Sequence, residues 1–80
     1  MKVTVKRKVN IQEVPITTEF IKLQDAMKLA NLVESGGEAK VVIQEGDVSV
    51  NGEVCTQRGR KLRPGDSFHF EGNTFRITQA

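Results

Sequence analysis

Residues 35–54 read SGGEAKVVIQEGDVSVNGEV, and this stretch decides the fold. Its first part predicts a helix, because the Ser35 hydroxyl can accept from the Glu38 N–H while the Glu38 carboxylate reaches back, as in a capping box. Gly46 is placed to end that helix in a left-handed conformation. Its second part alternates apolar and polar residues around Asn51-Gly52, a dipeptide typical of tight hairpin turns. We therefore predict a short helix followed by an antiparallel strand pair.

Another helix is expected just before this one. Apolar residues recur with helical spacing from Leu23 to Val33, with Leu29 widening the apolar face. The pattern predicts about three turns that end before Gly36-Gly37. Because almost no connector remains between the two helices, they are expected to pack at a sharp angle.

Strands are predicted on both sides of the helices. Residues 2–14 alternate as one or two short edge strands, and Pro15 is expected to stop the ladder because it has no N–H to donate. Turns are predicted at 64–66 and 71–73, and the strands around them carry alternating core phenylalanines: Phe68, Phe70 and Phe75. The fold class is therefore α+β, with two short helices packed on one side of a small antiparallel sheet.

The length and composition predict one compact domain. The chain has 80 residues and a formal net charge of +2, which is too mild to identify a nucleic-acid partner by itself. Its single cysteine, Cys55, excludes an internal disulfide and a Cys-rich metal site, and we expect it to pack in the core. No apolar run reaches transmembrane length and the start lacks a secretory signal pattern, so we expect a cytoplasmic protein without a membrane partner.

The candidates for catalytic chemistry are few. His69 is the only histidine, and its place between two core phenylalanines directs it to solvent, without a recognisable nucleophile or orienting carboxylate. The acidic residues show no metal-loop spacing, and Gly36-Gly37 is not followed by a phosphate-binding Gly-Lys-Ser/Thr sequence. We therefore expect a protein that is not an enzyme, with no cofactor, no metal and no small-molecule substrate.

Two features could bind phosphate. The segment between Val54 and Gly65 has four basic residues and no acidic one, so its side chains could converge on a phosphate backbone: Arg58, Arg60, Lys61 and Arg63. The alternative is a solvated loop that maintains solubility. The start of the second helix, at Ser35, Gly36 and Gly37, could present free backbone N–H groups to an anion, with Lys40 one turn on. The alternative there is a tight turn between helices. The two features support one site only if the fold brings them together.

Several stretches together resemble the S4 RNA-binding domain, and more narrowly its short stand-alone bacterial YaaA-like members. They are IKL at 21–23, SGGEAK at 35–40, VSVNGEV at 48–54, RGRKL at 58–62 and PGD at 64–66. The resemblance covers roughly residues 20–71. It implies the αL motif, two helices followed by a small bent sheet, in a domain over 20–80 that carries an N-terminal strand extension over 1–19.

The resemblance also implies recognition of structured RNA (ribosomal, transfer or ribosome-associated) largely through phosphates, by a monomer. The surface that it implies consists of Lys22, Ser35, Gly36, Gly37, Lys40, Arg58, Arg60 and Lys61, to which the charge pattern adds Arg63. The family commonly has Ser-Arg where this chain has Ser35-Gly36, so the expected phosphate contacts shift to Lys40 and the basic loop. Two alternatives stay open. One is a protein-interaction module that pairs its N-terminal strand with a partner's sheet edge, and the other is an enzyme fragment whose catalytic domain lies on another chain.

Overall fold

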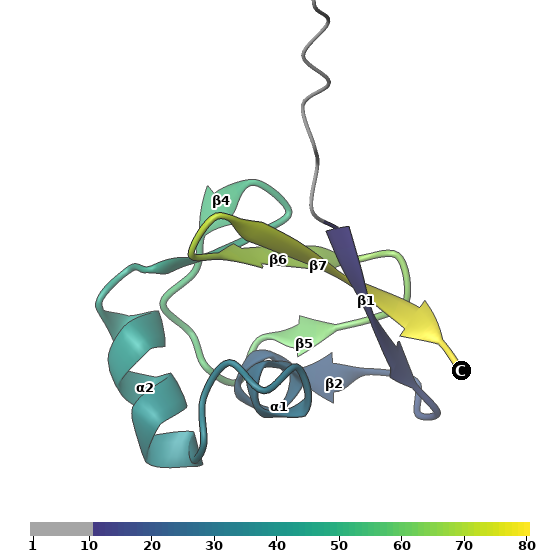
Figure 1. Cartoon of the computed structure of the whole chain (residues 1–80), viewed down its shortest axis with the longest axis horizontal. Helices are drawn as coiled ribbons and strands as arrows, with labels where there is room; N and C mark the ends of the chain where they lie inside the picture. Colours follow the sequence, from purple (N-terminus) through teal and green to yellow (C-terminus); the bar gives the residue numbers. More distant parts are fainter. Residues whose placement is uncertain (1–10) are drawn as a thin grey trace, which may run out of the picture.

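The structure, a computed structural model, describes residues 11–80 and places two helices on one side of a five-stranded sheet (Figure 1). That sheet has the strand order β1-β7-β6-β3-β4, and β2 and β5 form a separate two-stranded ribbon. The elements are β1 (Ile11–Ile16), β2 (Ile21–Lys22), α1 (Leu23–Leu29), α2 (Gly36–Gln44), β3 (Val48–Val50), β4 (Glu53–Val54), β5 (Lys61–Leu62), β6 (Ser67–Phe70) and β7 (Asn73–Gln79). The predicted α+β class is confirmed, but the sheet is mixed, because β1 pairs with β7 in parallel.

Strand β1 differs from the prediction in its relation to Pro15. The strand runs through Pro15, which lies opposite Thr78 in β7. The Ile16 carbonyl accepts from the Ala80 N–H over 2.8 Å, so the backbone polar groups of Ile16 face β7. Those of the preceding residue, Pro15, point the opposite way, to the open edge of the sheet. Proline has no N–H to donate, but no ladder hydrogen bond is lost at that edge. The prediction that Pro15 stops the ladder is therefore wrong. The rest of the predicted 2–14 strand region, residues 2–10, lies outside the described residues, and the division at residue 19 stays a prediction.

Helix α1 is shorter than the three turns predicted. It ends at Leu29, because Asn31 adopts a left-handed conformation with φ of 62°. The N–H of Leu32 donates to the Met27 carbonyl over 2.9 Å, and the N–H of Asn31 donates to the Lys28 carbonyl over 3.0 Å, which closes a Schellman motif. Leu29 therefore sits at the helix end with 55% of its surface exposed, and its assignment to the apolar face is wrong.

Helix α2 starts and ends at the predicted residues. The Ser35 hydroxyl accepts from the Glu38 N–H over 3.3 Å, and the Glu38 carboxylate accepts from the Glu34 N–H over 2.9 Å, one residue earlier than in a standard capping box. Gly46 has a φ of 84° and follows the last turn, as predicted. Figure 1 shows α1 end-on and α2 from the side, so the two helices cross at a sharp angle.

Two tight turns join the strands of the larger sheet. Asn51 and Gly52 have positive φ values of 50° and 91° and connect β3 to β4, while Glu71 and Gly72 connect β6 to β7 in the same way. The Asn51 side chain also reaches the turn at 64–66: it accepts from the Ser67 N–H over 3.0 Å and donates to the Asp66 carboxylate over 3.2 Å. The hairpin is thereby tied to the beginning of β6.

The core lies between the helices and the sheet. Phe68 and Phe75 face each other across β6 and β7, with ring centroids 5.0 Å apart in a stacked arrangement. From the other side, Leu23, Met27 and Ile43 of the helices are fully buried. Burial of each of these large side chains contributes about 2 kcal/mol to the free energy of folding. Neither helix in the described part of the chain is long and apolar enough to span a membrane.

Candidate nucleic-acid interface

The β2–β5 ribbon presents basic residues on its outer face. Ile21 lies opposite Leu62, and Lys22 lies opposite Lys61. Leu62 is fully buried and Ile21 packs against the core, so the alternation of a strand turns both lysines to solvent. Two ammonium groups from distant parts of the sequence therefore share one surface.

The basic loop that leads into β5 is fastened to the start of α1. The N–H of Leu23 donates to the Arg60 carbonyl over 2.9 Å, and the N–H of Gln24 donates to the Arg58 carbonyl over 3.1 Å. These two N–H groups belong to the first turn of α1, where no partner exists within the helix, and Lys22 at the N-cap provides no side-chain bond. The loop carbonyls satisfy them, which holds Arg58 and Arg60 beside Lys22.

Arg63 lies at the other end of the ribbon, next to an aromatic ring. The Lys61 Nζ atom is 4.9 Å from the ring centroid of Phe20, and the Arg63 Cζ atom is 5.9 Å from it. Phe20 is not among the site residues predicted from the sequence. Phe20 lies two residues before Lys22, and residues two apart in a strand face the same side. This spacing points to the site only when the pairing of β2 with β5 is known.

The cations of this surface are not neutralised by carboxylates. Within residues 11–80, the only ion pair joins Lys28 to Asp25 over 3.3 Å on α1. The structure thus brings together five of the nine predicted site residues in what we call the basic ribbon surface: Lys22, Arg58, Arg60, Lys61 and Arg63. Its charge is available to a polyanion.

Among the described residues, no hydrogen bond joins the start of α2 to this surface. The hydrogen bonds that hold the basic loop go to α1, so the inclusion of Ser35, Gly36, Gly37 and Lys40 stays a prediction. Gly36 and Gly37 do not have positive φ values, and a Cβ at Gly36 would meet no atom within 4 Å. The alternative that these glycines serve a tight turn therefore finds no support in their backbone geometry.

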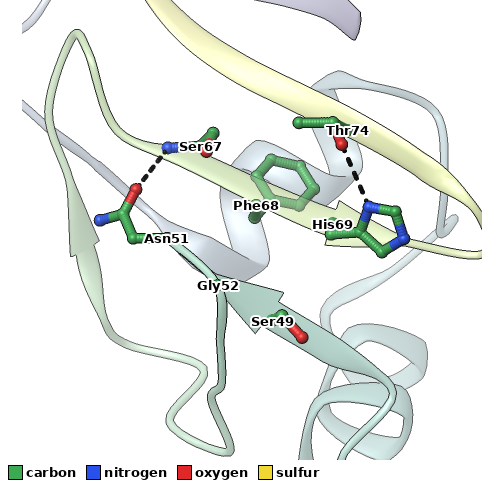
Figure 2. Close-up of a pocket in the computed structure, with 7 residues that line it drawn as sticks. All are labelled: Ser49, Asn51, Gly52, Ser67, Phe68, His69 and Thr74. Atoms are coloured by element: carbon green, nitrogen blue, oxygen red, sulfur yellow. Dashed lines mark hydrogen bonds between the residues drawn. The ribbon is translucent and has the colours of Figure 1, made fainter. Parts of the chain in front are cut away.

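A hollow lies on the sheet face, away from the basic ribbon surface. Its volume is about 350 Å³. The residues that line it are labelled in Figure 2: Ser49, Asn51, Gly52, Ser67, Phe68, His69 and Thr74. His69 is exposed as predicted, and its Nδ1 atom lies 3.1 Å from the Thr74 hydroxyl oxygen. Among residues 11–80, no carboxylate or thiol lines the hollow, and Cys55 is buried elsewhere, as predicted. The lining therefore offers neutral hydrogen-bonding groups rather than an acid–base pair.

Comparison with known proteins assigns the fold to a family. The family model for the S4 domain matches residues 14–78, so the chain belongs to the S4 domain family and the predicted resemblance is confirmed. The "Probable ribosome maturation protein RlbA" of Bacillus subtilis (strain 168) is 46% identical over 59 residues, which make up 74% of this chain and 83% of that protein. YbcJ of Escherichia coli (strain K12) is 37% identical over 57 residues, or 71% of this chain and 81% of that protein.

The solved structure of YbcJ from Escherichia coli is similar over the whole fold. The TM-score is 0.59 with 27% sequence identity, and the alignment covers 98% of each chain. That structure is described as revealing an αL motif involved in RNA binding. The predicted arrangement of two helices and a small sheet is thereby confirmed at the level of the family fold.

Proposed function

We propose that this chain is a non-catalytic module that binds structured RNA through phosphate contacts and shape. The observation that carries the proposal is the pair of hydrogen bonds from Leu23 and Gln24 to the basic loop. They place the arginines of that loop beside Lys22 and Lys61 on one surface, where no carboxylate of residues 11–80 forms an ion pair with them. Such a surface suits the evenly spaced charges of a nucleic-acid backbone. Membership of the S4 domain family and the RNA-binding motif described for YbcJ support RNA as the nucleic acid.

The ribosome is the first partner to test. The relative from Bacillus subtilis is named as a ribosome maturation protein, and we extend this to ribosomal RNA as the proposed ligand of the present chain. A monomeric state and a cytoplasmic location are part of the same proposal. The location is supported by the single cysteine, which suits a reducing compartment, and by the sequence pattern without an apolar run of transmembrane length. The monomeric state is carried over from the family resemblance.

A binding role is favoured over a catalytic one by the surroundings of the reactive side chains. His69 contacts a threonine hydroxyl on an open sheet face, and Cys55 is buried with its thiol 3.6 Å from the Gln57 carbonyl oxygen. Neither arrangement provides a nucleophile activated by an adjacent base. The basic ribbon surface, by contrast, is exposed and needs no further group to attract phosphate.

The experiment is a titration of the full chain with fluorescent ribosomal RNA fragments that contain helix junctions, at several salt concentrations. A DNA duplex of matched length is the control. We expect tighter binding to the RNA and an affinity that falls linearly on a logarithmic plot against salt. Equal affinity for the DNA duplex would indicate a non-specific polycation. Absence of RNA binding at low salt would refute the proposal and favour the protein-interaction alternative.

A further inference from the structure

We propose that Phe20 is a positioning residue of the RNA-binding surface, whose ring gathers Lys61 and Arg63 into a geometry that can contact phosphates. This inference rests on the proposed function and deepens it. Ile21 and Leu62 face the core, so the neighbouring positions on both strands face outward: Phe20, Lys22, Lys61 and Arg63. One aromatic ring and three cations thus occupy the same face.

Core packing does not explain Phe20. Among residues 11–80, the partly buried apolar residues that pack against the core are Ile21, Ala30, Leu32 and Val42, and Phe20 is not one of them. It is nevertheless half-buried. The groups that lie against its ring are the ends of Lys61 and Arg63. The ring therefore packs with the cations rather than with the hydrophobic interior.

The ring also offsets the repulsion between cations on this surface. Lys22 and Lys61 lie directly opposite each other, and like charges in that position repel. A carboxylate would relieve the repulsion, but it would also cancel the charge that attracts phosphate. The face of an aromatic ring carries partial negative charge and no net charge, so it attracts the cations and leaves their full charge for a ligand. The ammonium group of Lys61 keeps N–H donors that do not point at the ring.

Local bonds hold this arrangement on both strands. The Thr18 hydroxyl donates to the Phe20 carbonyl over 2.8 Å, which fixes the backbone before the ribbon. On the other strand, the Asp66 carboxylate accepts from the Arg63 N–H over 2.8 Å. The ring and the two cations are therefore presented from fixed backbone positions, which reduces the ordering that RNA binding requires.

The test replaces Phe20 with phenylalanines carrying one, two and three ring fluorines, which weaken the negative ring face at nearly constant size. RNA affinity should fall step by step along the series, and Phe20→Leu should lower it by about two- to fivefold. Phe20→Trp, which keeps a strong ring face, should retain binding. In NMR spectra of the free chain, the ring-current shift of the Lys61 side-chain protons should disappear in Phe20→Leu. Equal affinity across the fluorinated series would overturn the proposal even if Phe20→Leu failed to fold.

A double-variant cycle separates positioning from a direct contact. If Phe20 acts through the two cations, Phe20→Leu should change RNA affinity very little once Lys61 and Arg63 are both replaced by methionine. An undiminished effect in that background would overturn the positioning role. The RNA affinity of Arg60→Ala tests the proposed function independently of Phe20. Loss of RNA binding in Arg60→Ala with a flat Phe20 series would reject the role of Phe20 alone, whereas a wild-type chain without RNA binding would reject both.

Discussion

The backbone N–H of Leu23 donates to the backbone carbonyl of Arg60 over 2.9 Å, which joins the first residue of α1 to the basic loop. A helix start usually leaves such N–H groups free for an anion. Here the first two are already satisfied by the protein's own carbonyls, so the start of α1 cannot bind phosphate through them. The charge at this place must come from side chains, and the same bonds bring the arginine side chains there.

The first prediction concerns these side chains. Arg60→Ala and Lys61→Ala should each weaken RNA binding for every RNA sequence and flatten the salt slope by about one unit, because a variant with one phosphate contact fewer releases fewer counterions from the RNA. The control is Arg76→Ala, which removes the same charge from the exposed face of β7, in the other sheet. Binding isotherms at several salt concentrations decide the matter. Equal losses in all three variants would contradict a localised site.

The second prediction asks whether the start of α2 belongs to the surface. Lys40 is exposed on the first turns of α2. We expect Lys40→Ala to reduce the salt slope as Arg60→Ala does, by about one unit, since both cations are predicted to contact phosphates. The same titrations measure it. A slope unchanged from the wild type would restrict the site to the basic ribbon surface.

The third prediction concerns the cap of α2. Ser35→Ala removes the acceptor of the Glu38 N–H and should lower the free energy of unfolding by about 1 kcal/mol. Ser35→Asp keeps an acceptor at the same position and should stay near the wild type. Urea denaturation followed by circular dichroism provides both values. A midpoint for Ser35→Ala that matches Ser35→Asp would show that the cap contributes nothing.

The fourth prediction concerns the link between the β3–β4 hairpin and the turn before β6. Asn51→Ala loses both side-chain hydrogen bonds, to Ser67 and Asp66, and should destabilise the fold by about 2 kcal/mol. Asn51→Gly loses the same bonds but adopts the positive φ without strain, so it should recover about 1 kcal/mol of that loss. Thermal and urea unfolding compare the two variants. If alanine and glycine were equally destabilising, backbone strain would play no part.

The fifth prediction separates the open sheet face from RNA binding. The His69 ring lies 3.1 Å from the Thr74 hydroxyl oxygen, on a different surface from the basic ribbon. His69→Ala should therefore leave the RNA affinity and its salt slope within experimental error of the wild type. Anisotropy titrations at fixed pH and salt are sufficient. A large loss of affinity with an intact circular dichroism spectrum would place the site on the sheet face instead.

Local features were predictable because their interactions span only a few residues. Each of three features depends only on residues a few positions away in sequence: the Ser35 cap, the Gly46 stop and the Asn51-Gly52 turn. The end of α1 was missed, although its signal was also local: Asn31 is a residue type that tolerates the left-handed conformation. The helical spacing of apolar residues continues beyond Leu29 to Val33, so spacing alone predicts a longer helix.

The sequence by itself therefore determined the helix cap and stop of α2, the turns, the core phenylalanines and the presence of an acid-free basic loop. Only the tertiary structure decided where that loop goes. The parallel pairing of β1 with β7, the bond from Leu23 to Arg60 and the contact of Phe20 with Lys61 join residues far apart in the chain. No local pattern encodes such pairings, because they form only when burial of the shared core brings the segments together.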